Sequence, residues 1–166
     1  MIQMDNEHSY ISVVEEFSNL VYRIAYQNLM NVADAEDVVQ EVFIKLLKHS
    51  EGFEDREHIK AWLLRVTINQ CRDYHKRLFR RKETVFETEL LEQFEPVRQE
   101  PEENFVLSEL RKLSETDRNI VYLHYYEGYS LREIADMLNK SPNAVNVRLV
   151  RARKKLKTIL SEEGFE

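Results

Sequence analysis

The sequence predicts an all-α protein of two small helical domains joined by an acidic linker, with a helix-turn-helix in the second domain. Apolar residues recur at helical spacing over long stretches, and only three glycines and three prolines interrupt 166 residues. The two domains, residues 1–82 and 105–166, carry net charges of −1 (12 basic, 13 acidic) and +2 (11 basic, 9 acidic). The linker, residues 83–104, carries −7 (1 basic, 8 acidic), so the acidity is concentrated between the domains.

Three helices are expected in the first domain. The first spans about residues 10–30 and the third runs from about Glu57 to Phe79 or beyond. The second begins at Asp34, with Asp37 three positions on as its cap partner, and ends near His49. The first two helices have apolar core faces at helical spacing, formed by Val13, Val14, Phe17, Leu20, Val21, Ile24 and Ala25, and by Ala35, Val38, Val39, Val42, Phe43 and Leu46.

The acidic linker contains Pro96 and Pro101 and shows little helical periodicity after Glu92. Two interpretations stay open for it. It is a solvated tether with no other role, or its negative charge and few apolar residues occupy a basic groove on a partner. Those apolar residues are Val85, Phe86, Leu90, Leu91 and Phe94.

The helix-turn-helix is predicted over residues 129–160. Ser130 and Glu133 make a capping box, and Asn139 tolerates the left-handed backbone that ends a helix. Ser141 is the next N-cap, followed by Pro142 at the first helical position. In the second helix a buried stripe is expected from Val145, Leu149, Ala152, Leu156 and Leu160. The opposite arc holds Asn146, Val147, Val150, Arg151 and Lys154, with Arg148 and Lys155 at its edges.

Such a helix, apolar on one side and basic on the other, is typical of a recognition helix in the DNA major groove. Paired amphipathic helices also occur in proteins that never touch DNA, and a basic face is usually only solvated. The density of cations favours DNA here, because phosphate neutralisation supplies much of the affinity. The run comprises Arg148, Arg151, Arg153, Lys154, Lys155 and Lys157.

Composition argues against several other classes of protein. No segment approaches the roughly 20 apolar residues of a membrane span, and the first residues do not have the pattern of a signal peptide. A single cysteine, Cys71, suits the cytoplasm and is expected in the core. The five histidines are scattered without metal-ligand spacing, and no phosphate loop or nucleophile motif is present. We therefore expect no catalytic residues, no metal, no cofactor, and no lipid or small-molecule ligand.

Two helices of the first domain carry more than a fold requires. The outer face of the second has Asp37, Gln40, Glu41 and Lys48 around Ile44, and an apolar residue in such a place is either a partner contact or an ordinary exposed side chain. In the third helix, Arg65, Asn69, Arg72 and Lys76 form one mostly basic stripe. Trp62 and Tyr74 border it, and bases can stack on such rings, although apolar neighbours favour Trp62 as a core anchor.

Three segments in register, residues 34–43, 59–77 and 113–156, strongly resemble the bacterial extracytoplasmic-function (ECF) sigma factors. The resemblance covers nearly the whole chain and places the linker correctly. It implies a protein that binds core RNA polymerase, recognises promoter DNA and helps to open the duplex. It also implies an anti-sigma factor as a partner.

The resemblance assigns a role to each surface. Asp37, Gln40, Glu41 and Ile44 would contact the polymerase clamp helices. The loop 49–57 would capture unpaired bases of the minus-ten element, with Trp62, Arg65, Asn69, Arg72 and Lys76 on the DNA side of the following helix. The residues expected to read the minus-thirty-five element are Asn146, Val147, Arg148, Arg151 and Lys154. The acidic linker would run through the RNA path of the polymerase.

The chain departs from its relatives at several positions. Asn139 replaces a common glycine, and Ser114 replaces a common proline, where it would cap a helix with Asp117 as reciprocal partner. Asn146 and Val147 replace a basic residue and a serine. Because asparagine pairs with adenine and valine contacts the thymine methyl, we expect a minus-thirty-five site richer in A·T pairs.

Two other functions compete with the sigma factor. A stand-alone helix-turn-helix regulator would bind DNA as a dimer and ignore polymerase, and it would need neither residues 34–43 nor the basic third helix. A small hydrolase with acidic metal clusters is disfavoured by the absence of ligand spacing.

Overall fold

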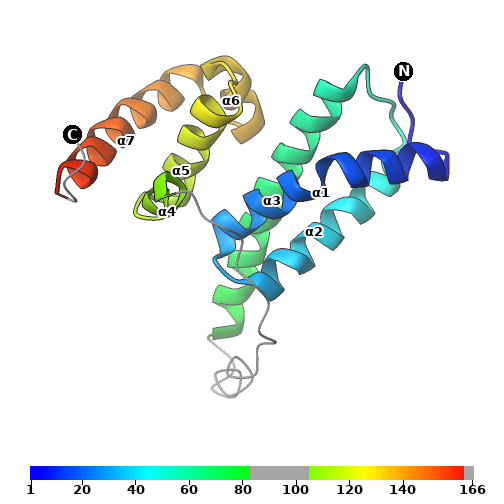
Figure 1. Ribbon diagram of the computed structural model, residues 1–166, viewed down its shortest axis with the longest axis horizontal. Helices are drawn as coiled ribbons and strands as arrows, with labels where there is room; N and C mark the ends of the chain where they lie inside the picture. The colour runs from blue at the N-terminus through cyan, green and yellow to red at the C-terminus, as the bar shows by residue number, and fades with distance from the viewer. Residues whose placement is uncertain (83–104, 163–166) are drawn as a thin grey trace. The chain divides into compact units, whose positions relative to one another are not determined.

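The computed structural model describes residues 1–82 and 105–162, and the chain divides into two compact units, residues 1–101 and 102–166. In the first unit, α1 (Glu7–Leu29), α2 (Val32–Leu47) and α3 (Arg56–Lys82) pack against one another pairwise (Figure 1). Each helix contributes fully buried residues to one core, among them Val21, Val38 and Leu63. Cys71 is buried with them, as expected for a structural cysteine.

The caps of the first unit differ from the sequence expectation. α2 begins two residues earlier than expected, and its cap is Asn31, whose side chain accepts a hydrogen bond of 2.9 Å from the backbone N–H of Asp34. The Asp34–Asp37 capping pair is therefore wrong: Asp34 lies in the first turn, where its charge suits the helix dipole. α1 also starts earlier than expected, at the cap Asn6.

The loop between α2 and α3 is tied to the amino terminus. Ile2 and Phe53 exchange two backbone hydrogen bonds, of 2.7 and 2.8 Å, and Phe53 is fully buried. The Phe53 ring packs between His49, at a centroid distance of 4.8 Å, and Trp62, at 5.8 Å. Trp62 thus anchors the loop against the core, which agrees with the core interpretation of this residue.

The second unit consists of α4 (Phe105–Leu110), α5 (Glu115–Val121), the π-helical segment η3 (Tyr122–Tyr126), α6 (Leu131–Leu138) and α7 (Pro142–Glu162). α5 and α6 both pack on α7. Ile120, Ile134 and Val145 are fully buried between them. Apart from the isolated Ile2–Phe53 bridge, the regular structure of residues 1–82 and 105–162 is helical, so the all-α prediction is confirmed. None of these helices combines the length and hydrophobicity of a membrane span.

The turn between α6 and α7 has the expected chemistry. Ser130 and Glu133 form a reciprocal capping box, with hydrogen bonds of 3.2 and 2.7 Å. Asn139 ends α6 with a φ of 53°, in the left-handed region. The Ser141 hydroxyl accepts from the backbone N–H of Ala144 at 3.1 Å, and Pro142 is the first residue of α7. These local interactions fix the angle at which α7 leaves the turn.

Candidate functional surfaces

The outer face of α2 carries an exposed apolar pair. Ile44 is 49% exposed, as its position on the polar face predicted, and Leu47, one turn further on, is 55% exposed. Sequence reasoning missed Leu47, although its spacing from Ile44 places both side chains on neighbouring positions. Asp37 and Gln40 are exposed polar residues of the same helix, and the exposed Lys48 is its C-cap. Two apolar side chains with a polar border have the composition of a small protein-binding surface.

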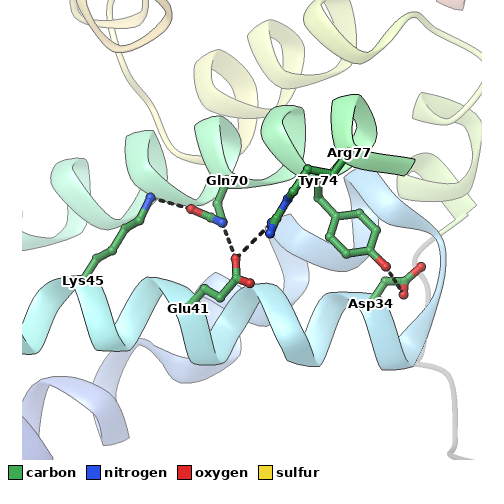
Figure 2. Close-up of polar contacts among 6 residues, drawn as sticks. All are labelled: Asp34, Glu41, Lys45, Gln70, Tyr74 and Arg77. Atoms are coloured by element: carbon green, nitrogen blue, oxygen red, sulfur yellow. Dashed lines mark hydrogen bonds and ion pairs between the residues drawn. The ribbon is translucent and has the colours of Figure 1, made fainter. Parts of the chain in front are cut away.

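Glu41, which was expected on this face, is partly buried and bound to α3 (Figure 2). Its carboxylate accepts from the Gln70 amide and pairs with Arg77 at 3.4 Å. The Gln70 amide oxygen accepts from Lys45 at 2.5 Å, so one buried glutamine links two charged residues of α2. This network joins the face of α2 to α3. Gln70 could not be identified from the sequence, because its partners lie 25 and 29 residues away.

The basic stripe of α3 lies outside the core. Arg65, Asn69, Arg72 and Lys76 are all exposed, which confirms their common face. Tyr74, expected at the border of the stripe, instead donates its hydroxyl hydrogen to the Asp34 carboxylate and packs against the core (Figure 2). Its ring is therefore occupied inside the unit, and stacking of a base on Tyr74 is no longer expected.

α7 presents the arc that its periodicity predicted. Val145, Leu149 and Ala152 are buried, whereas the opposite side is exposed and comprises Asn146, Val147, Val150, Arg151 and Lys154. Leu156 is half-buried, and the side chain of Leu160 lies outside the described part of the chain. The outer arc thus offers one amide, two apolar side chains and two cations to a ligand.

Arg148 lies at the edge of this arc and is not freely extended. Its guanidinium donates to the Asp117 carboxylate of α5 at 3.0 Å. Ser114 caps α5 by accepting from the Asp117 backbone N–H at 3.3 Å, as expected. The reciprocal half of the expected cap is replaced, because the Asp117 carboxylate pairs with Arg148. The ion pair fixes one guanidinium nitrogen and leaves the rest of the half-exposed arginine available to a further acceptor.

Both units of the chain match known proteins. The family model for sigma-70 region 2 matches residues 13–81, and that for sigma-70 region 4 matches residues 106–156. The chain is 27% identical to the RNA polymerase sigma factor SigV of Bacillus subtilis, over 93% of each chain. It is 31% identical to the RNA polymerase sigma factor CnrH of Cupriavidus metallidurans, covering 79% of this chain and 75% of CnrH.

A solved structure supports the same relationship. The structure of CnrH in complex with the cytosolic domain of CnrY matches with a TM-score of 0.66 at 28% identity, over 95% of this chain and 91% of that one. Counterparts of both helical units therefore occur together in one known family. The chain belongs to the sigma-70 family of RNA polymerase sigma factors, in its extracytoplasmic-function group.

Proposed function

We propose that this sigma factor initiates transcription by binding core RNA polymerase through α2 and promoter DNA through α3 and α7. One observation carries the proposal: a single chain combines two exposed basic helix faces, on separate units, with an apolar pair on α2. A stand-alone regulator needs only the helix-turn-helix. The family matches include the first unit as well as the second, which favours the sigma factor over that alternative.

The polymerase contact is assigned to Ile44 and Leu47, with Asp37 and Gln40 at its border. Interfaces commonly bury a few apolar anchors inside a polar rim, and this is the pattern on α2. Glu41 contributes in a second way, because its carboxylate is held by Gln70 and Arg77. It presents a fixed negative charge beside the apolar pair, and its loss would also disturb the contact with α3.

The minus-ten contact is assigned to α3 and the loop before it. Arg65, Arg72 and Lys76 follow the DNA backbone as point charges, and Asn69 supplies a polar contact between them. Trp62 is held by His49 and Phe53, so we assign it to positioning the loop 49–57 close to the unpaired bases.

The minus-thirty-five contact is assigned to the outer arc of α7. Asn146 and Arg151 would form hydrogen bonds with base edges, while Val147 contacts a thymine methyl. Arg148 and Lys154 would bind phosphates. We expect a preference for A·T pairs at the bases that Asn146 and Val147 reach. Selection from randomised promoters tests this, and a preference for G·C pairs alone at those bases would contradict it.

Regulation and location follow from the same function. CnrH has been solved in complex with the cytosolic domain of CnrY. We propose that an anti-sigma factor likewise binds this chain and holds it inactive. The proposed activity requires core polymerase and chromosomal promoters, so we assign the chain to the cytoplasm. The chemistry of RNA synthesis would belong to the core polymerase, with no catalytic residue or cofactor contributed by the sigma factor.

Run-off transcription tests the proposal directly. Purified chain is added to core polymerase on a library of promoter fragments, and transcripts are compared with those made by core polymerase alone. We expect a defined subset of promoters to give run-off products. Binding to core polymerase with no promoter used would refute the proposal. Specific DNA binding without binding to core polymerase would support the stand-alone regulator.

A further inference from the structure

Phe79, near the carboxyl end of α3, is 71% exposed. Phenylalanine is usually buried, so exposure to this extent is informative in a large aromatic side chain. Phe79 follows Lys76 by three residues and therefore continues the stripe of Arg65, Asn69, Arg72 and Lys76 along the same face of α3. The stripe thus ends in an exposed aromatic ring.

The other two rings near the stripe are occupied within the fold. Tyr74 donates its hydroxyl hydrogen to Asp34. Trp62 contacts His49 and Phe53, at centroid distances of 5.0 and 5.8 Å. An aromatic residue that makes neither kind of contact is free to present the face of its ring to a ligand. Among the described aromatic residues of α3, Phe79 is the most exposed.

The charge around Phe79 favours nucleic acid as that ligand. The sequence from residue 74 to residue 82, YHKRLFRRK, contains five basic residues and no acidic residue. A basic track that follows the backbone, combined with an aromatic ring for the bases, is the usual arrangement for binding single strands. In an intact duplex both faces of a base are covered by its neighbours. A ring beside the helix can stack only on a base that has left the duplex.

We propose that Phe79 stacks on an unpaired base of the opened promoter, at the end of the backbone track formed by the α3 stripe. The inference rests on the proposed function, because it requires a polymerase holoenzyme that opens DNA. It adds a DNA contact outside residues 59–77, the segment of α3 that carries the resemblance to the family. The side-chain charges of Arg72 and Lys76 contact the DNA backbone and supply affinity without regard to sequence. The ring of Phe79 holds the strand in its open state.

Fluorescence of a promoter fragment with a premelted bubble tests the stacking. Holoenzymes are assembled from core polymerase and the full-length chain, as wild type, Phe79→Tyr, Phe79→Leu or Lys76→Ala. The bubble carries 2-aminopurine at successive unpaired positions, one position in each fragment. We expect wild type and Phe79→Tyr to quench one of these positions. Phe79→Leu, which keeps an apolar side chain without a ring, loses that quenching and binds the bubble roughly tenfold more weakly.

The salt dependence of binding separates stacking from charge. Because stacking neutralises no phosphate, Phe79→Leu leaves the slope of log K against log salt unchanged. Lys76→Ala lowers that slope by about 0.7 for one lost contact with a single strand, and it keeps the quenching. Thermal unfolding of each variant checks the fold. We expect Phe79→Leu to have the same melting temperature as the wild type, because the ring is exposed.

Three results would overturn the inference. Wild-type affinity and quenching in Phe79→Leu would exclude stacking while leaving the proposed function intact. A loss of core polymerase binding in that variant would identify Phe79 as a protein contact instead. A wild-type holoenzyme that binds no premelted promoter would refute the proposed function, and the inference with it.

Discussion

Ile44→Lys separates the polymerase contact from the stability of the fold. Full burial of an isoleucine side chain contributes about 1.5–3 kcal/mol. Ile44 is 49% exposed, so its burial contributes roughly half of that, about 1 kcal/mol, and the methylene groups of lysine recover a part. We therefore expect the free energy of unfolding to fall by about 1 kcal/mol or less. Leu46→Ala, at a fully buried position of the same helix, is expected to cost about 2–5 kcal/mol.

Ile44→Lys should weaken binding to core polymerase more than it weakens the fold. Loss of an interface anchor commonly costs about 2 kcal/mol or more, which is about 30-fold in Kd. Lysine would add the cost of placing an ammonium group against an apolar surface. Titration of fluorescently labelled chain with core polymerase measures the Kd. We expect Ile44→Lys to raise it by about 30-fold or more while the variant remains folded.

Ile11→Lys is the matched control, because Ile11 of α1 is the same residue type and is 44% exposed. It places the same charge on the first unit, outside the α2 face. We expect its Kd for core polymerase to equal that of the wild type. If both variants bound core polymerase equally weakly, the added positive charge alone would explain the effect. Wild-type binding by Ile44→Lys, or its unfolding, would refute the assignment of this face.

Three further predictions concern single interactions. Arg151→Ala should weaken promoter binding by about 1–3 kcal/mol if the arginine reads a base, and competition between minus-thirty-five variants should show relaxed specificity at one position. Asn139→Ala should lower the melting temperature of the second unit, because alanine in the left-handed conformation costs about 1–2 kcal/mol, whereas Asn139→Gly should melt at or above the wild type. Gln70→Leu leaves Glu41 and Lys45 without their shared amide, and denaturant unfolding should show a loss of about 1–3 kcal/mol.

The features that could be predicted from the sequence depend on neighbouring residues. The capping box of Ser130 and Glu133, the left-handed Asn139 and the cap at Ser141 each involve residues within three positions. The exposure of Ile44 followed in the same way from the helical period, since the core face of α2 was well marked. Local interactions of this kind do not depend on which helices pack against one another.

The features that were missed depend on residues far apart in the chain. Tyr74 is held by Asp34, 40 residues away, and Glu41 by Gln70, 29 residues away. The pairing of Ile2 with Phe53 likewise joins the amino terminus to a distant loop. A helical period shows that a side chain leaves its own core face, but it does not show which polar group of another helix receives it. For this reason Tyr74 was expected only as a ring at the border of the basic stripe, and Glu41 was expected on a free outer face.

Net charge is a poor guide to DNA binding in this chain, because the acidic residues of the second unit are partly used inside the fold. Three of them have partners that fix the helices: Glu109 pairs with Lys112 at 2.8 Å, Asp117 with Arg148 at 3.0 Å, and Glu133 accepts from the Ser130 backbone at 2.7 Å. On the outer arc of α7, between residues 146 and 157, the sequence has no acidic residue at all. A segment of net charge +2 can therefore present a face whose charges are all positive. Phosphates respond to that local field over about one Debye length, and not to the formal net charge of the whole segment.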